Sequence, residues 1–171
     1  FYFSMFIEIC ALLAIIFIIL ALLTFISNWG NGPATELTHS MKDKIVVITG
    51  GSRGIGLETT KDLLRQGATV IMGCRNDAQA KQAINSIENL THKSRCSFLH
   101  LDLTDYENIK SFTEEIKSKY GKIDILINNA GSCFRNFTLS DGIELTYFTN
   151  HIGHLILSCL FLDDFNPKGR I

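Results

Sequence analysis

The chain has 171 residues, of which 46% are hydrophobic and 19% are charged, and its formal net charge at pH 7 is -1. This length suits one domain of ordinary size, and the nearly balanced charge gives no indication of a nucleic-acid partner. Its five cysteines contain no CxxC pair, which argues against both a disulfide framework and a zinc site.

An apolar run lies near the start of the chain. Residues Ile9–Ile26 are 18 in number and carry no charge, which is about the minimum length of a membrane-spanning helix. Trp29, just after the run, is typical of a membrane interface. The alternative is a cleaved signal peptide, but no Lys or Arg precedes the run, and the run is longer than the roughly 7–15-residue apolar region of such peptides. The sequence therefore predicts a membrane anchor over residues 1–27.

Basic residues beside the anchor bear on its orientation. Lys42 and Lys44 follow the apolar run, whereas none precedes it. This favours a cytosolic position for the residues after the anchor. The triplet Asn136-Phe-Thr138 matches a glycosylation sequon, and it matters only if the domain faces a lumen.

A polar linker and then an alternation of strands and helices follow the anchor. The linker, residues 28–42, contains the breakers Gly30, Gly32 and Pro33, and residues 43–171 form the expected folded domain. Short apolar runs rich in β-branched residues predict buried parallel strands. The strands are expected at Lys44–Thr49, Ala68–Gly73, Ser97–Leu101 and Ile123–Ile127, and the helices at Gly54–Gln66, after Asn76, after Thr104 and at Ser140–Asp163.

Capping residues mark the expected ends of the helices. Asn76 is expected to cap the second helix, and Thr104-Asp-Tyr-Glu107 matches a capping box for the third. Gly67 and Gly121 are expected to end the first and third helices. Four strands alternating with four helices predict an α/β fold, a doubly wound parallel sheet with helices on both faces.

The boundary between the first strand and the first helix is rich in glycine. Gly50, Gly54 and Gly56 fall in the stretch TGGSRGIG of residues 49–56. Glycine lets a backbone approach a ligand closely, and a helix N-terminus offers N–H groups and partial positive charge to a phosphate. A turn whose glycines serve packing alone is the alternative, because the spacing differs from the GxGxxG of many dinucleotide-binding folds.

Three further motifs follow in order: LDLTD at Leu101–Asp105, NNAG at Asn128–Gly131 and NHIGHLIL at Asn150–Leu157. With these motifs in register, residues 43–171 resemble the short-chain dehydrogenase/reductase family. GCRN at Gly73–Asn76 and NHIGHLIL are most similar to its membrane-anchored retinol dehydrogenase and polyprenol dehydrogenase branch. The resemblance implies a Rossmann-type fold. It also implies hydride transfer between a nicotinamide cofactor and a lipophilic alcohol or carbonyl compound that is retinoid-, polyprenol- or steroid-like.

The resemblance implies a cofactor site built from these motifs. Arg53 and Arg75 fall where a guanidinium can grip a 2′-phosphate, and no carboxylate ends the second strand to accept from a free ribose hydroxyl. The expected cofactor is therefore NADP(H). For Asp102 the alternative is a structural role as a cap before Thr104. The expected cofactor-binding residues are Gly50, Ser52, Arg53, Gly54, Ile55, Gly56, Arg75, Asn76, Asp102, Leu103, Asn129, Ala130 and Gly131.

One catalytic residue is expected in the chain. Asn150 matches the family's helix asparagine, which the resemblance assigns to a proton relay at the catalytic site. His151 and His154 flank it and are interpreted as packing residues, because no third metal ligand is evident. The family's catalytic Tyr and Lys form a YxxxK motif after this asparagine. The one YxxxK here, Tyr106–Lys110, comes earlier, in the third helix, and is interpreted as a pair of surface neighbours.

Several family elements are expected to be missing from these 171 residues. The sheet is expected to stop after about four strands, in the order 3-2-1-4, which would leave Ile123–Ile127 as an open apolar edge. No catalytic serine and no YxxxK follow Asn150, and residues 1–4 precede the first Met, so the chain is interpreted as the N-terminal part of an oxidoreductase and as inactive alone.

Two interpretations of such a chain stay open. It is part of the sequence of the enzyme, or it is a truncated product that binds nucleotide or a partner without catalysis. The expected partners are a lipophilic small molecule and an intracellular membrane such as the endoplasmic reticulum. A homodimer is left open.

Overall fold

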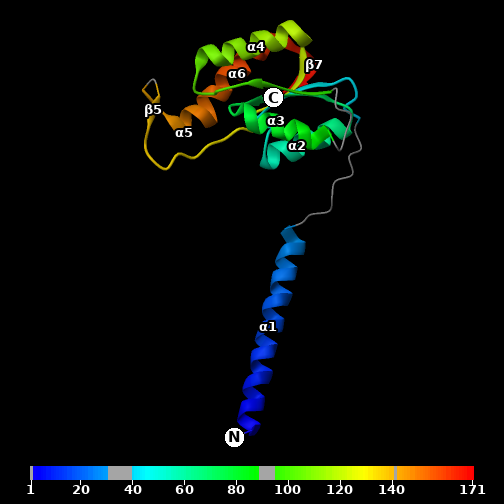
Figure 1. The fold of residues 1–171 in the computed structure, drawn as a ribbon, viewed down its shortest axis with the longest axis vertical. Helices are drawn as coiled ribbons and strands as arrows, with labels where there is room; N and C mark the ends of the chain where they lie inside the picture. Colours follow the sequence, from blue (N-terminus) through cyan, green and yellow to red (C-terminus); the bar gives the residue numbers. More distant parts are fainter. Residues whose placement is uncertain (1, 31–39, 89–94, 141) are drawn as a thin grey trace. The chain divides into compact units, whose positions relative to one another are not determined.

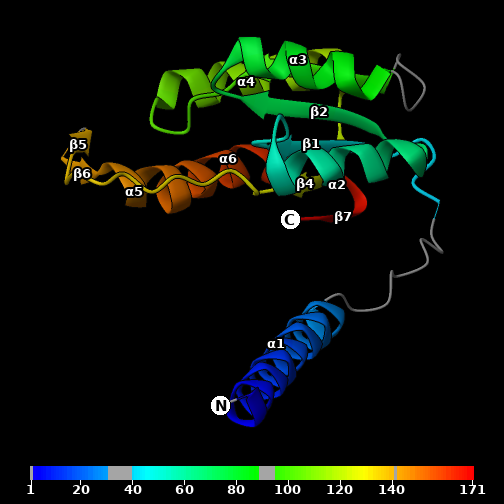
Figure 2. The same cartoon turned by 60° about the horizontal axis from the view of Figure 1, so that its bottom comes forward.

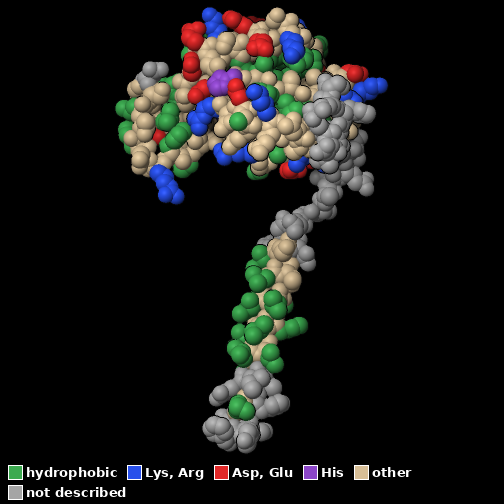
Figure 3. All heavy atoms as spheres, in the orientation of Figure 1, with side chains coloured by type: hydrophobic (Ala, Val, Ile, Leu, Met, Phe, Trp, Pro, Cys, Tyr) green, Lys and Arg blue, Asp and Glu red, His purple; other side chains and the backbone are tan. Residues whose placement is uncertain are grey.

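A computed structural model describes residues 2–30, 40–88, 95–140 and 142–171. The chain divides into two compact units, Phe1–Thr38 and His39–Ile171. The first contains one helix, α1 (Tyr2–Gly30), in which Leu, Ile, Phe and Ala run without a helix breaker. The large hydrophobic side chains described in α1 are exposed, and Figure 3 shows them along the helix. Most of the expected linker, residues 31–39, lies outside the described residues.

Within the described residues, length and hydropathy together select one segment that could cross a membrane, and that segment is not α1. Leu145–Asp164 satisfies both criteria, but 33% of it is buried, and it packs on the sheet as a core helix does. The described apolar part of α1, Ala11–Ser27, is a shorter helix of 17 residues. The segment that meets these criteria, Leu145–Asp164, therefore fits a core helix of the folded unit.

The second unit is built on a five-stranded parallel sheet (Figure 1). The strands are β1 (Ile45–Thr49), β2 (Thr69–Cys74), β3 (Cys96–His100), β4 (Ile123–Ile127) and β7 (Phe165–Arg170), in the order β3-β2-β1-β4-β7. The central strand is β1, whose Val47 pairs with Ile71 of β2 and Leu126 of β4. The four strands predicted from the sequence are present, each within one residue of its expected bounds.

The strand β7 corrects the expected sheet. The prediction that the sheet stops after four strands with β4 as an open edge was wrong, because β7 pairs with β4 in parallel, with Phe165 opposite Ile123. The strand contains Pro167, which has no N–H donor. At the edge of a sheet a proline is tolerated, and β7 is an edge strand. Its pairing shifts register, and Lys168 has a positive φ of 72°.

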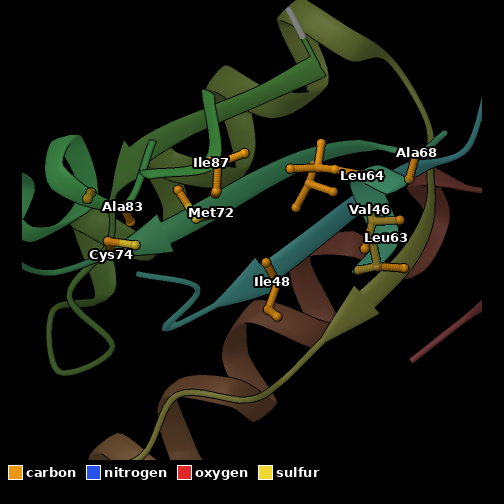
Figure 4. Close-up of a cluster of buried hydrophobic side chains, with 11 residues drawn as sticks. Val46, Ile48, Leu63, Leu64, Ala68, Met72, Cys74, Ala83 and Ile87 are labelled. Atoms are coloured by element: carbon orange, nitrogen blue, oxygen red, sulfur yellow. The ribbon is translucent and has the colours of Figure 1, made fainter. Parts of the chain in front are cut away.

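Helices cover both faces of the sheet, as the alternation predicted (Figure 2). They are α2 (Gly54–Arg65), α3 (Asp77–Glu88), α4 (Tyr106–Tyr120) and α6 (Gly153–Phe161). Because successive side chains of a strand point to opposite faces, Val46 and Ile48 pack with α2 and α3, whereas Val47 packs with α4 and α6. Figure 4 shows the first of these clusters, in which Met72 of β2 and Ile87 of α3 are almost fully buried. Burial of each such side chain contributes about 1.5–3 kcal/mol.

The helix expected at Ser140–Asp163 begins later than predicted. A hairpin of β5 (Leu139–Ser140) and β6 (Ile143–Glu144) occupies its first residues. The Glu144 carboxylate then caps the helix, accepting from the N–H groups of Thr146 at 2.9 Å and Tyr147 at 2.8 Å. The helix continues as α5 (Leu145–Tyr147), a π-helical turn η2 (Phe148–Ile152), α6 and a 3-10 turn η3 (Leu162–Asp164). Two-residue strands are too short to show an alternating pattern, so the sequence did not reveal the hairpin.

The N-terminal caps predicted for α3 and α4 can be compared with the structure. Asn76 caps α3 through its side-chain oxygen, as expected. The capping box at Thr104 was wrong by one residue: Asp105 caps α4, and its carboxylate accepts from the N–H of Asn108 at 3.0 Å. The Thr104 hydroxyl is engaged elsewhere, donating to the Asp102 carboxylate at 2.7 Å.

Candidate functional site

A cleft of about 860 Å³ lies at the carboxyl ends of β1 to β4. β2 and β4 flank β1, so the strand order reverses here, and in open parallel sheets ligands bind outside such a point. The structure brings every cofactor-binding residue expected from the sequence to this cleft. These residues are Gly50, Ser52, Arg53, Gly54, Ile55, Gly56, Arg75, Asn76, Asp102, Leu103, Asn129, Ala130 and Gly131.

The glycine loop joins β1 to α2. Gly50 and Gly54 have φ angles of 68° and 54°, which strain residues other than glycine. At Gly56 a Cβ would lie 2.4 Å from the Gly50 oxygen and 2.5 Å from Asn129 Nδ2. The first turn of α2 has no acidic residue, and its N-cap, Arg53, makes no side-chain capping hydrogen bond. The loop thus leaves backbone N–H groups at a helix N-terminus for an anion, which fits a dinucleotide pyrophosphate.

Thr49, the last residue of β1, holds the start of the next cleft segment. Its buried hydroxyl accepts from the N–H groups of Asn129 at 3.0 Å and Ala130 at 2.9 Å. The Asn129 side chain returns the contact, donating to the carbonyl oxygens of Thr49 at 2.9 Å and Gly50 at 3.3 Å. We call this set of hydrogen bonds, together with the His154 contact described next, the Thr49 latch. It places the glycine loop against residues 129 and 130.

His154 belongs to the same latch, and this role of His154 was not predicted from the sequence. Its Nε2 lies 2.9 Å from the Thr49 hydroxyl, and its Nδ1 lies 3.2 Å from the Asn150 carbonyl oxygen. Burial lowers the pKa of the His154 imidazole, and the hydrogen bond to the Asn150 carbonyl opposes this shift only in part. The interpretation of His154 as a packing residue therefore omitted a polar role. The helical i, i+4 spacing from Asn150 was the available signal.

Asn150 lies beside the cleft and holds its rim. The N–H of Ser132 donates to Asn150 Oδ1 at 2.7 Å, and Asn150 Nδ2 donates to the Ser132 carbonyl at 2.8 Å. Ser132 lines the cleft. Both polar atoms of the Asn150 side-chain amide are thus engaged with the backbone of Ser132.

The opposite end of the cleft is charged and exposed. Arg53, Arg75 and Asp77, which we call the arginine end, all line the cleft and all are exposed. The Asp77 carboxylate is 3.0 Å from Nδ1 of His100, the last residue of β3. Asp77 was missed from the sequence because it stands three residues beyond β2, outside the position where an acidic residue was sought.

Two lining residues support loops around the cleft. The Asp102 carboxylate accepts from the N–H of Thr104 at 2.9 Å and from its hydroxyl at 2.7 Å, so the structural role weighed for Asp102 is present. The Cys74 thiol lies under the glycine loop, where burial raises its pKa and a hydrogen bond with Ser52 opposes that rise. The neutral thiol is therefore the favoured form.

Tyr106 and Lys110 do not reach the cleft. Tyr106 is half exposed at the first position of α4, and neither residue is part of the cleft lining. Their position agrees with their interpretation as surface neighbours on a helix.

Comparisons with known proteins identify the family of this arrangement. The family model for short chain dehydrogenases matches residues 44–171. The chloroplastic short-chain dehydrogenase TIC 32 B of Brassica napus is 39% identical over 148 residues, 84% of this chain and 46% of that protein. Retinol dehydrogenase 12 of Mus musculus is 39% identical over 70% of this chain and 38% of its own length. Human polyprenol dehydrogenase is 36% identical over 74% of this chain and 39% of its own length.

A solved structure supports the same conclusion. An uncharacterised protein from Mycobacterium paratuberculosis superposes with a TM-score of 0.68 and 32% identity, covering 80% of this chain and 48% of that one. The chain spans less than half the length of the relatives to which it was aligned. Members of the family use a nicotinamide dinucleotide, which fits the glycine loop and the Thr49 latch. The match over residues 44–171, with the motifs placed around one cleft, shows that the chain belongs to the short-chain dehydrogenase family.

Proposed function

We propose that the protein containing this chain is an NADP(H)-dependent oxidoreductase that transfers hydride between nicotinamide and a lipophilic alcohol or carbonyl compound. One observation carries the proposal: the glycine loop, two arginines and residues 129–131 converge on a single cleft. Relatives named for retinol and polyprenol support a retinoid-, polyprenol- or steroid-like substrate. In this proposal the chain supplies the cofactor-binding part of the enzyme.

Each part of the cleft has a role in this proposal. The glycine loop binds the pyrophosphate through backbone N–H groups, Asp102 and Leu103 flank the adenine, and residues 129–131 line the ribose. Asn150 keeps Ser132 in place at the rim. The bound nicotinamide supplies or accepts the hydride.

The choice of NADP(H) over NAD(H) rests on the arginine end. A guanidinium grips a phosphate through paired, charge-assisted hydrogen bonds, and both Arg53 and Arg75 are free to move toward one because they are exposed. The carboxylate in this region, Asp77, is already paired with His100. A 2′-phosphate bound here would thus face two guanidinium groups, and the Asp77 carboxylate would already be paired with His100.

Calorimetric titration with NADP+ and with NAD+ tests this proposal. We expect tighter binding of NADP+, and Arg75→Asp should narrow or reverse the preference by about 1–3 kcal/mol, the range for a hydrogen bond to a charged group. Arg135→Asp makes the same charge change at an exposed residue outside the cleft lining and should leave the preference unchanged. Equal affinities for the two nucleotides in the unmutated chain would contradict the choice of cofactor.

We also propose that residues 1–27 anchor the protein in an intracellular membrane, that residues 28–42 link it, and that residues 43–171 bind the cofactor. The helix α1 has 29 residues, and a rise of about 1.5 Å per residue gives about 44 Å, longer than the roughly 30 Å hydrocarbon core of a bilayer. Its described apolar side chains from Leu12 to Ile26 are exposed. An apolar surface of this extent marks contact with a membrane or a partner.

Carbonate extraction and glycosylation test the anchor and its orientation. The full chain should stay in the membrane pellet, and deletion of residues 1–28 should release it into the soluble or aggregated fraction. Asn136 is exposed in the loop before β5, so it would be glycosylated in a lumen and unmodified in the cytosol. Release of the intact chain by carbonate would refute the anchor, and a glycan at Asn136 would refute the cytosolic orientation.

By itself the chain is expected to transfer no hydride. General acid–base groups contribute about 10²–10⁴-fold to such reactions, and the YxxxK in this sequence lies away from the cleft. The purified chain should therefore be inactive with NADPH and a reactive aldehyde. Turnover that disappears on Tyr106→Phe would place the catalytic site at α4 and contradict this expectation.

A further inference from the structure

The Thr49 hydroxyl has more neighbours than one hydroxyl can serve equally. Within hydrogen-bond distance of Thr49 Oγ1 lie the N–H groups of Asn129 and Ala130, Nε2 of His154 at 2.9 Å, and the Ile127 carbonyl at 3.4 Å. A hydroxyl has one proton to donate and two lone pairs. The two N–H groups fill both lone pairs, so the hydroxyl proton goes to the nearer remaining acceptor, His154 Nε2.

The other ring nitrogen of His154 fixes the tautomer. Nδ1 faces the Asn150 carbonyl at 3.2 Å, and a carbonyl only accepts, so Nδ1 carries the proton. The tautomer, assigned from this hydrogen-bond network, is neutral with Nε2 as an acceptor. Thr49, His154 and the two backbone N–H groups are then all satisfied at once.

His154 also connects the two points that hold one side of the cleft. At one end, Thr49 binds the N–H groups of Asn129 and Ala130, and at the other, the Asn150 side chain binds Ser132 on both its N–H and its carbonyl. The imidazole contacts the hydroxyl of Thr49 and the backbone of Asn150. The π-helical turn η2 and Gly153, whose Cβ would lie 2.2 Å from the Leu103 oxygen, bring this helix close enough for the contact.

We propose that neutral His154 is a positioning residue for the nucleotide cleft, and that its protonation loosens residues 129–132 and weakens binding of NADP(H). This inference rests on the proposed function for its ligand. A protonated His154 donates from both nitrogens, so Thr49 Oγ1 would face three donors with two lone pairs. The Asn129 N–H also donates to the Ile127 carbonyl at 3.0 Å, so the Ala130 N–H is the group that would be left without an acceptor.

The surroundings of His154 favour this behaviour. Its ring is buried at 7% exposure. On the elements that touch its helix, Lys117 of α4 is bonded to the Leu160 carbonyl at 2.8 Å and to Asp164 at 2.6 Å, and Asp102 is bonded to Thr104. His151, in the preceding turn, stacks on Tyr147. Burial and the Asn150 carbonyl alone shift the pKa of His154, with burial prevailing and lowering it.

Calorimetric titration with NADP+ at pH 8 and pH 5.5, on the full chain in detergent, tests the link between protonation and binding. His154→Gln keeps an acceptor for the Thr49 hydroxyl but does not titrate, and His154→Leu removes the acceptor. The unmutated chain should lose about tenfold more affinity on acidification than His154→Gln, since one neutral hydrogen bond corresponds to about that factor. His154→Leu should bind about tenfold more weakly at both pH values. Protonation of the 2′-phosphate is common to all three proteins and cancels.

Amide hydrogen exchange without nucleotide separates this inference from the proposed function. On acidification, protection of residues 129–132 should fall in the unmutated chain and persist in His154→Gln. Equal pH profiles for these two proteins, or wild-type affinity in His154→Leu, would overturn the inference even if NADP+ binds. Loss of protection in acid with no binding of NADP+ at pH 8 would instead support the positioning role and overturn the proposed function.

Discussion

The Thr49 latch and the arginine end line the same cleft but are made of different interactions. In the latch, Thr49 is fully buried and His154 is 7% exposed, and short hydrogen bonds connect them to the backbone of residues 129 and 130. At the arginine end, Arg53 and Arg75 are exposed, and the Asp77–His100 pair is about half exposed. A buried polar group costs about 1–3 kcal/mol when it loses its partner, whereas an exposed ion pair contributes about 0–1 kcal/mol. The latch should therefore govern the shape of the cleft, and the arginine end the choice of ligand.

Thr49→Val should give the largest effect. The substitution keeps the shape of the side chain but leaves the Ala130 N–H and His154 Nε2 without their hydroxyl partner. We expect a loss of about 2–3 kcal/mol in the free energy of unfolding and a weaker affinity for NADP+, measured by urea denaturation and calorimetry. Thr69→Val, at a half-buried strand position, is the control and should change stability by less than about 0.5 kcal/mol. Equal effects of the two substitutions would show that the latch contributes nothing.

Gly153→Ala tests whether the latch depends on close approach of the helix. An alanine Cβ would lie 2.2 Å from the Leu103 backbone oxygen, so the helix must shift, at a cost of about 1–3 kcal/mol. Gly131→Ala is the matched change in the same cleft, where the nearest atom to a Cβ is Asn150 Oδ1 at 3.7 Å. Thermal unfolding should separate the two variants clearly. A Gly153→Ala protein as stable as Gly131→Ala would mean that the approach is not required.

Thr60→Val tests the same reasoning about buried hydroxyl groups, but here we expect the stability of the fold to rise. Thr60 is fully buried beneath the glycine loop, and among the described residues its hydroxyl is the one buried side-chain polar atom without a hydrogen-bond partner. Replacing an unpaired hydroxyl with a methyl of the same shape should stabilise the fold by about 1 kcal/mol. Thr113→Val, which removes a hydroxyl that donates to Ile109 O at 2.7 Å, should not. Urea denaturation of both variants measures the difference, and a destabilised Thr60→Val would indicate that this hydroxyl has a partner in solution.

His100→Gln should give the smallest effect. It removes the exposed pair with Asp77 at the arginine end, and we expect a change in stability below about 0.5 kcal/mol and a change in NADP+ affinity below about threefold. The same measurements made at high salt should reduce even these differences. A loss of more than 2 kcal/mol would remove the distinction between the two ends of the cleft.

Local patterns predicted the parts of the fold that depend on neighbours in the sequence. The four apolar runs became strands, Asn76 became a cap, and the glycine loop lies where the strand–helix boundary predicted it. The edge strand β7 was missed because its place in the sheet depends on pairing with Ile123, which is distant in the sequence. Glu144 was missed as a cap because the hairpin before it has strands of two residues.

The residues of the cleft also divide into those that the sequence predicted and those that it did not. Its motifs, in order along the chain, identified the lining residues through their resemblance to a family. The hydrogen bond between Thr49 and His154 joins residues 105 positions apart, so nothing close in the sequence indicates it. Asp77 was missed for another reason: a helix turn, not a strand end, carries its carboxylate to the cleft.

The central position of β1 has a consequence for synthesis on the ribosome. Translation produces β1, β2 and β3 first, and β4 follows β1 by roughly 70 residues. At about 5–20 residues per second, that interval lasts on the order of 4–15 s. For that time one edge of the nascent β1, rich in valine and isoleucine, has no native neighbour, while the apolar α1 segment has already been made. The emerging chain thus exposes an unpaired edge of an apolar strand before it can make the strand that covers it.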